Sequence, residues 1–279
     1  MGTAAAKGKT RPTIVDGIFY PAQRAKLRAL VESLLSRSKT PEGRSFAVVS
    51  PHAGYSYAGD VIASAFRAIR LRQVKTAVLI GPVHRDPLEG IFLPESEEFS
   101  TPLGTIPVDM DIVRRLATIG SIFTESDVPH LEEHCIEVQL PFLMHLFPEA
   151  SIVPLLIGEA KLKTIQALSD ALRLTFENAE DYTVFIASAN MASYMRGTDM
   201  QNESETMKRL IADRDWRGIA SAVEKGGISS CGTAGIAALL CLGGEGLNVE
   251  LLAEADSRVV DGDRTRGVHY ASFGLAKEE

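Results

Sequence analysis

The feature of this sequence that most constrains its fold is an alternation of short, uniformly apolar segments with longer segments of helical period. Four short segments rich in β-branched residues are predicted to be buried strands: 46–50 (FAVVS), 76–80 (TAVLI), 151–157 (SIVPLLI) and 183–187 (TVFIA). Strands without polar alternation are typical of a sheet that is covered on both faces. The alternation therefore predicts an α/β fold, with a mostly parallel or mixed sheet and helices on both faces.

Segments with apolar residues at helical spacing are predicted to be helices, at 27–35, 61–69, 109–119, 132–146, 162–177, 206–225 and 233–241. Two further strands are expected near 249–255 and 268–273. No linker rich in Pro, Gly or Ser and no internal repeat divides the chain. We therefore expect a disordered tail over residues 1–10 and a single domain over residues 11–279.

Composition excludes several classes of function. The net charge is −7 and the pI is about 5.5, whereas general nucleic-acid binding requires a basic surface. The apolar stretch at 235–244 is too short to span a bilayer, and the start of the chain lacks the apolar stretch of a signal peptide. Three cysteines provide no disulfide framework. We expect a cytoplasmic protein that binds a small molecule or a peptide, and neither nucleic acid nor a membrane.

Polar residues directly follow three of the predicted strands: His52, His84 and the stretch 188–190. In open α/β sheets ligands bind at the carboxyl ends of the strands, where such loops converge. A histidine at this edge can bind a metal or transfer a proton; the alternative is a loop histidine that is hydrogen-bonded to backbone. Two histidines on one predicted edge favour a shared pocket.

Cys231 lies just before the predicted helix 233–241. A helix N-terminus lowers the pKa of a thiol and favours the thiolate, which binds metals and attacks electrophiles; the alternative is a buried, small apolar side chain. The sequence contains no glycine-rich nucleotide-binding loop, no His-Glu-x-x-His and no serine nucleophile elbow. The candidate chemistry therefore rests on the histidines and Cys231.

The segment 132–146 offers further titratable residues. His134 and Glu137 lie three residues apart and would share one face of a helix, so we expect them to act as an acid/base residue and its orienting partner. His130 and His134, four residues apart, are an alternative helical metal pair.

Several ordered blocks together resemble the Memo family, which includes protein B of the bacterial AmmeMemoRadiSam system. They are 16–21 (DGIFYP), 51–59 (PHAGYSYAG), 81–84 (GPVH), 99–104 (FSTPLG) and 133–143 (EHCIEVQLPFL). The resemblance implies a fold similar to that of the class III extradiol dioxygenases, which hold non-haem iron. It also implies that His52, His84 and Cys231 are metal ligands. Because a thiolate is a soft ligand, we expect Fe(II) or copper, with zinc as a further option.

The sequence departs from this family at the fourth strand end. Where the family has Ser-Ser-Asp-x-Ser-His-Tyr, this chain has Asn190 in place of the Asp and Ser193 in place of the His. The family's His resembles the general base of the dioxygenases, and neither replacement can take up a proton near neutral pH. His134 is the candidate that remains for acid/base work.

These observations leave three hypotheses open. The first is a metal-dependent redox or dioxygenase-like enzyme of unknown substrate. The alternative is a non-catalytic protein that uses the same pocket to bind a peptide or partner, since the resemblance implies phosphotyrosine-peptide binding in animal members and association with a radical-SAM protein in bacteria. The third is a thiol enzyme with Cys231 as nucleophile.

Overall fold

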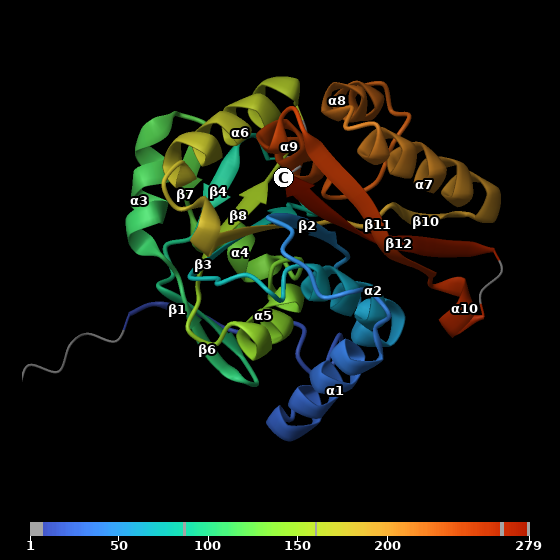
Figure 1. The fold of residues 1–279 in the computed structure, drawn as a ribbon, viewed down its shortest axis with the longest axis horizontal. Helices are drawn as coiled ribbons and strands as arrows, with labels where there is room; N and C mark the ends of the chain where they lie inside the picture. The colour runs from blue at the N-terminus through green and yellow to red at the C-terminus, as the bar shows by residue number, and fades with distance from the viewer. Residues whose placement is uncertain (1–7, 86–87, 160, 263–264, 278–279) are drawn as a thin grey trace, which may run out of the picture.

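The structure is a computed structural model that describes residues 8–85, 88–159, 161–262 and 265–277 (Figure 1), with the side chains of residues 193–195 and 261 outside the description. Most of the predicted tail, residues 1–7, also lies outside it. Thr10, the last residue of the predicted tail, forms β1 (Thr10–Arg11) with the first residue of the predicted domain, and β1 pairs with Glu98 and Phe99.

A nine-stranded mixed sheet forms the centre of the described chain, in the order β10-β12-β2-β9-β3-β8-β4-β7, with β11 paired to β12. Its strands are β2 (Ala47–Ser50), β3 (Thr76–Pro82), β4 (Ile91–Leu93), β7 (Phe123–Glu125), β8 (Ser151–Ile157), β9 (Thr183–Ser188), β10 (Ala192–Arg196), β11 (Leu247–Asp256) and β12 (Arg266–Lys277). The four strands predicted from apolar segments, β2, β9, β3 and β8, are adjacent and parallel. All residues of β2 and β9 are buried, which confirms a sheet that is covered on both faces.

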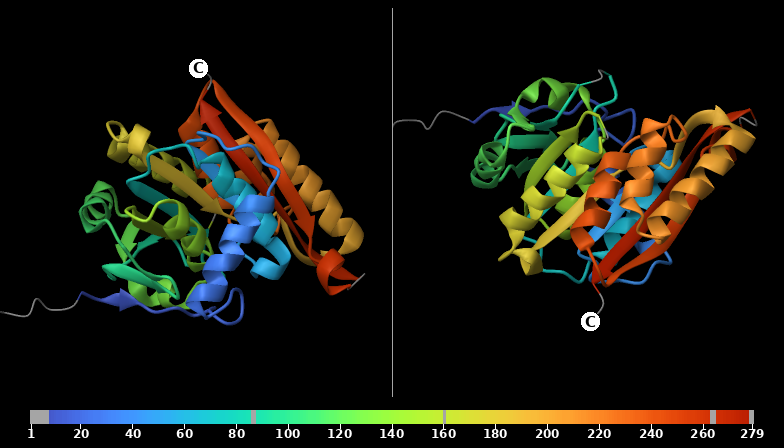
Figure 2. Two further views of the ribbon diagram at one scale, coloured as in Figure 1. Left: turned by 60° about the horizontal axis from the view of Figure 1, so that its bottom comes forward. Right: turned by 90° about the horizontal axis from the view of Figure 1, so that it is seen from above.

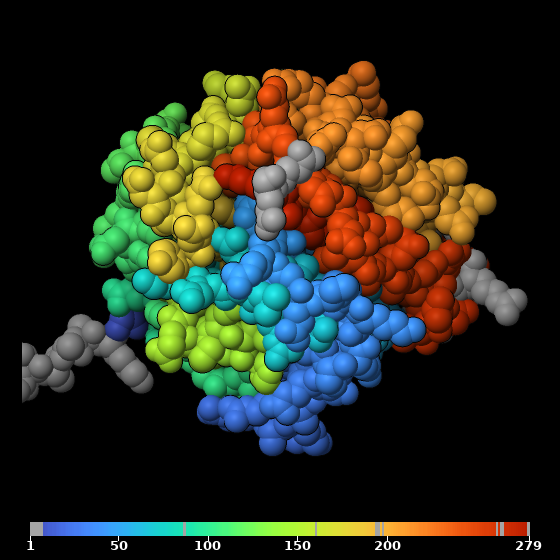
Figure 3. All heavy atoms as spheres, in the orientation of Figure 1, coloured from blue at the N-terminus to red at the C-terminus, as the bar shows by residue number. Residues whose placement is uncertain are grey.

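Helices cover both faces of this sheet, as Figure 2 shows. One face carries α6 (Leu162–Phe176), α7 (Gly197–Ala212), α8 (Trp216–Glu224) and α9 (Thr233–Gly243). The opposite face carries α1 (Arg24–Arg37), α2 (Tyr55–Ala68) and α5 (Leu140–Leu146). On the surface seen in Figure 3, the C-terminal strands (red) border the N-terminal helices (blue), because α2 packs against β11 and β12. The predicted α/β class is confirmed.

The remaining elements lie at the periphery. They are β5 (Glu98–Thr101) and β6 (Gly104–Pro107), which complete a small sheet with β1, and the helices α3 (Met110–Ile119), α4 (Asp127–Glu132) and α10 (Arg258–Asp261). No helix in the described ranges is long and apolar enough to cross a membrane.

Two predicted helices are broken. The segment 206–225 contains a turn at Arg214, whose φ of 60° ends the helical path, and Asp215 then caps α8. The segment 132–146 is interrupted at Glu133, which has the extended backbone angles φ −99° and ψ 132°. After this residue it forms a short 3₁₀ helix, Glu137–Gln139, and α5. His134 and Glu137 therefore do not share a helix face.

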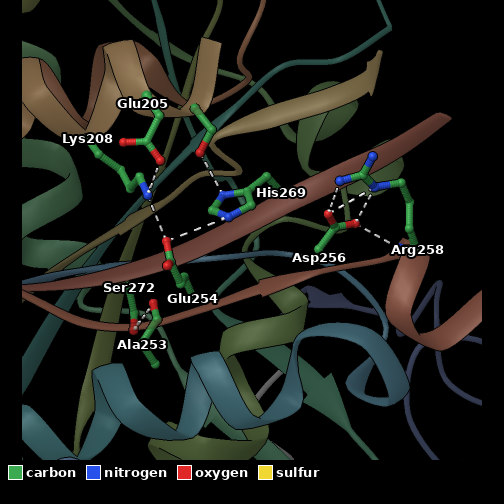
Figure 4. A network of polar contacts seen from close by, with 9 residues as sticks. Glu205, Lys208, Ala253, Glu254, Asp256, Arg258, His269 and Ser272 are labelled. Carbon is green, nitrogen blue, oxygen red and sulfur yellow. Dashed lines mark hydrogen bonds and ion pairs between the residues drawn. The ribbon is translucent and has the colours of Figure 1, made fainter. Parts of the chain in front are cut away.

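A polar network joins α7 to the C-terminal strands (Figure 4). Lys208 lies 2.7 Å from Glu205 and 2.8 Å from Glu254, and Ser204 Oγ lies 2.7 Å from His269 Nδ1. Burial is the main cause that lowers the pKa of His269. Glu205 and Glu254 are both exposed, so these ion pairs contribute little free energy.

A buried ion pair anchors the N-terminal segment to the loop before α5. Glu137 is fully buried and accepts hydrogen bonds from Arg11, the Tyr20 hydroxyl and the backbone N–H groups of Ile14 and Val15. Arg11 also donates to the His130 carbonyl in α4 at 2.9 Å and to the Glu133 carbonyl, where that loop begins, at 2.7 Å. One guanidinium therefore holds both ends of the loop.

Replacing Arg11→Met is expected to lower the free energy of unfolding by about 3–5 kcal/mol, because it leaves a buried carboxylate without a counter-charge. Urea denaturation of the variant and the wild type measures the loss. The matched control is Arg114→Met, which removes an exposed pair with Asp111 and is expected to cost less than about 1 kcal/mol. Equal losses in the two variants would contradict the prediction.

Candidate metal centre

The ends of two parallel strands and the start of a helix bring the three predicted ligands together. His52 and His84 each lie two residues after a strand, β2 and β3, and these strands flank β9 with their carboxyl ends at one edge. Cys231 precedes Gly232, the N-cap of α9. One ligand atom from each of His52, His84 and Cys231 lies within 4.8 Å of the other two. His52 Nε2 lies 3.2 Å from Cys231 Sγ.

The turn at Gly232 determines the position of Cys231. Gly232 has a φ of 80°, in the left-handed region, and a Cβ there would collide with the carbonyl oxygen of Ser188 at the end of β9. A side chain at this position would push the start of α9 away from the sheet. The close approach therefore places the thiol beside the two histidines.

The Nδ1 atom of each histidine, which points away from the other ligands, already has a hydrogen-bond partner. His84 Nδ1 lies 2.6 Å from a carboxylate oxygen of Glu133, and the other oxygen accepts from the His84 backbone N–H. His52 Nδ1 lies 3.0 Å from Ser188 Oγ. Partners of this kind orient the imidazole of metal-binding histidines. The Nε2 atoms of the two histidines are therefore the candidate metal ligands.

Cys231 and His84 stabilise each other's charged forms. Burial alone would raise the pKa of the Cys231 thiol, but the nearby His52 and His84 lower it well below its usual value. Burial likewise opposes the charged form of His84, yet hydrogen bonds to Cys231 and Glu133 raise its pKa to about 9. Without metal, these shifts favour a thiolate at Cys231 and an imidazolium at His84. A metal cation can replace the proton between them.

His134 lies against both metal-candidate histidines. Its ring is stacked on that of His84, with centroids 5.1 Å apart and an interplanar angle of 16°, and it lies 5.5 Å from that of His52. Burial and then repulsion by these two histidines lower its pKa to about 3. His134 is therefore neutral at physiological pH. With His84 and Glu133 it forms a second group whose ligand atoms lie within 4.8 Å of one another.

Two predicted pairings are wrong. Glu137 is not a partner of His134: its carboxylate binds Arg11, Tyr20 and backbone N–H groups. The alternative metal pair of His130 and His134 does not form either, because His130 is buried in α4 with Nε2 bonded to the Phe92 carbonyl at 3.0 Å. Within the described ranges, neither metal-capable group includes His130.

Asn190 and Ser193 are the two residues that depart from the family pattern. Asn190 is buried, and its Oδ1 accepts from the backbone N–H of His52 at 3.2 Å. Ser193 lies in β10, and its side chain is outside the described part of the protein.

A cavity of about 310 Å³ opens beside the cluster, lined by His84, Cys231 and residues from the end of β3 and the start of α9. The donor set of two imidazoles and one thiolate suits copper, zinc and iron better than magnesium or calcium. Bonds of about 2.1 Å to nitrogen and about 2.3 Å to sulfur place two ligands of one ion roughly 3–4 Å apart. The residues present therefore fit a soft or borderline transition metal.

The chain is similar to known proteins over most of its length. A family model described as Memo-like protein matches residues 11–274. The chain belongs to the Memo family. Similar members include MEMO1 family protein Ta0237 of Thermoplasma acidophilum, 30% identical over 265 residues, which cover 94% of this chain and 97% of the relative. A MEMO1 family protein of Thermotoga neapolitana is 31% identical over 278 residues, which cover 95% and 99%.

Membership of the Memo family confirms the resemblance inferred from the sequence blocks, and the matched range contains all three candidate ligands. Glu133 and Ser188 hold the two histidines. Glu133 was not predicted as a site residue, although it adjoins His134 in the sequence. Ser188 was predicted only as part of the polar stretch 188–190, without a role. The fold relation to class III extradiol dioxygenases stays a prediction.

Alkylation of metal-free protein tests the charge balance. Because its pKa is lowered, Cys231 is expected to be a thiolate throughout, so its rate with iodoacetamide stays nearly constant between about pH 6.5 and about pH 9. His84→Ala removes a hydrogen bond and a positive charge that lower the pKa of the thiol, so the rate at about pH 7 is expected to fall below that of the wild type and to increase with pH. Peptide mass spectrometry identifies the labelled cysteine.

The Cys241→Ser background removes the other partly exposed thiol. A wild-type rate that rises about tenfold per pH unit over this range would show an ordinary thiol and contradict the prediction.

Proposed function

We propose that this Memo-family protein binds one transition-metal ion, Fe(II) or copper, through His52, His84 and Cys231, and uses it in dioxygenase-like redox chemistry. Zinc is also chemically suitable. The observation that carries the proposal is the convergence of the three donor atoms within 4.8 Å, with both outer histidine nitrogens already bound. Three protein ligands leave coordination positions open for a substrate.

A bound redox-active ion would supply Lewis acidity and electron transfer. The protein's own residues supply orientation and proton positions. Glu133 holds the His84 ring and increases its donor strength. Neutral His134 offers a hydrogen bond beside the cluster, at the position that the predicted acid/base role requires. Glu137 acts at a distance, because with Arg11 it holds the loop that carries Glu133 and His134.

A second candidate function is binding without turnover. Asn190 favours it, because an amide cannot take up a proton and its oxygen is occupied by the His52 backbone N–H. The cavity of about 310 Å³ would accommodate a small molecule or one side chain of a peptide. A radical-SAM protein is the partner class that the family resemblance implies. A cytoplasmic location fits both functions, since no disulfide joins the described cysteines.

Metal analysis of protein purified without oxygen and without a histidine tag tests the site. Wild type is expected to hold about one ion per chain, and His52→Ala, His84→Ala and Cys231→Ser to lose it. His145→Ala and Cys241→Ser are matched controls, because both residues lie outside the two metal-capable groups of the described chain, and they should retain the metal. Folded wild type that binds neither Fe(II), Cu(I) nor Zn(II) would refute the proposal.

Oxygen consumption by the metal-loaded protein then separates the two candidate functions. Uptake that is lost in His134→Gln, with metal retained, supports catalysis with His134 as an acid/base residue. Full metal occupancy without uptake, across a set of reduced aromatic and thiol substrates, favours the binding function.

A further inference from the structure

We infer that Gln139 and Ser188 are positioning residues that fix the tautomer of His52, so that Nδ1 carries the hydrogen and Nε2 faces the metal position. This inference rests on the proposed metal site and extends it to residues that touch no metal. The evidence is a chain of hydrogen bonds from Gln139 through Ser188 to His52, in which the donor and the acceptor of each bond can be assigned.

The chain of contacts is built into the parallel pairing of β2 and β9. Ser50 and Ser188 are register partners at the carboxyl ends of these strands. Gln139, at the end of the 3₁₀ helix, contacts both hydroxyls. Ser50, Ser188 and Gln139 are 0% exposed and His52 is 2% exposed. Buried polar groups of this kind must satisfy one another.

The orientation of the Gln139 amide follows from a backbone carbonyl. The Pro51 oxygen lies 2.9 Å from one amide atom and can only accept, so that atom is Nε2. The second hydrogen of Nε2 points to Ser188 Oγ at 3.1 Å. Oε1 accepts from the Ser50 hydroxyl at 2.8 Å. The amide therefore donates to Ser188.

The single hydrogen of Ser188 is also accounted for. Its Oγ lies 2.8 Å from the Cys135 carbonyl oxygen, which can only accept, so the hydroxyl donates there. What remains on Oγ is acceptor capacity for two donors. Gln139 Nε2 is one of them, and His52 Nδ1, at 3.0 Å, must be the other. Nδ1 of His52 therefore carries a hydrogen.

The consequence lies on the opposite side of the ring. Because Ser188 holds the Nδ1 hydrogen, the hydrogen that the His52 ring can lose is the one on Nε2, which faces Cys231 Sγ at 3.2 Å. Only this proton, shared between Nε2 and the Cys231 sulfur, then has to leave when a cation enters. On His84 the Glu133 carboxylate likewise holds the Nδ1 hydrogen, so Nε2 is the nitrogen that loses its proton when a cation enters. The two ligands therefore have different anchors, a neutral hydroxyl for His52 and an anion for His84.

Ser188→Ala tests the inference, with Zn²⁺ alone as the probe. Removing the acceptor is expected to weaken Zn²⁺ binding about 10–100-fold, the usual effect of losing such a partner. Long-range ¹H–¹⁵N spectra of histidine-labelled protein report the tautomer directly. Wild type should show a protonated Nδ1 at His52 with and without Zn²⁺, and Ser188→Ala should populate the form with a bare Nδ1. Ser188→Thr keeps the hydroxyl and should restore both readouts.

The matched control is Ser272→Ala, the same change at a serine of β12 that is also 0% exposed and contacts the Ala253 carbonyl away from this chain of contacts (Figure 4). It should leave the Zn²⁺ affinity and the His52 signals unchanged. A bare Nδ1 in wild type would overturn the inference even if Ser188→Ala does not fold. So would wild-type affinity and an unchanged tautomer in folded Ser188→Ala.

Failure of the metal proposal is distinguishable from failure of this inference. Wild type that binds no Zn²⁺ but shows a protonated Nδ1 at His52, lost in Ser188→Ala, refutes the metal site and supports the tautomer assignment.

Discussion

The parallel pairing of β2, β9 and β3 is the constraint on which the candidate site depends. Because these strands run side by side in one direction, their carboxyl ends place His52, Ser188 and His84 at one edge of the sheet. The interior side chains below that edge are uniformly apolar, so the strand register cannot slip without exposing them or burying polar groups. The packing of the apolar core therefore determines the positions of the polar residues in the cluster.

Mutual stabilisation of opposite charges is the second condition for this site. A thiolate, an imidazolium and the Glu133 carboxylate lie within one partly buried cluster, and each stabilises the charged form of its neighbour. Nearby, Arg11 and Glu137 form a separate buried pair whose guanidinium also binds the loop that carries Glu133. Anchoring that loop from outside leaves the carboxylate of Glu133 available to His84. The ion pair thus supports the loop beside the candidate metal ligands without contributing a ligand itself.

The sequence predicted those parts of the structure that depend on local pattern. The strands β2, β3, β8 and β9 could be predicted because short, continuous apolar runs rich in β-branched residues are typical of buried parallel strands. Strands of three residues, such as β4 and β7, carry too little pattern to be recognised. The helix expected over 132–146 failed for a tertiary reason, since the extended Glu133 is held by His84 and Arg11. His52, His84 and Cys231 were named correctly as neighbours, whereas Gln139 and Ser188 become meaningful only when their partners are known.

Asn190 shows how this member can differ from its family without losing the site's geometry. The position receives a backbone N–H from His52, and an amide oxygen accepts that hydrogen bond as a carboxylate oxygen would. Replacing Asp by Asn therefore preserves the support of the His52 loop while removing a negative charge and a proton acceptor. The ligand positions depend on Ser188, Glu133 and the turn at Gly232, none of which needs that charge. The proposed metal binding and the proposed proton transfer therefore rest on different residues of this pocket, because Asn190 supports the His52 loop without being able to take up a proton.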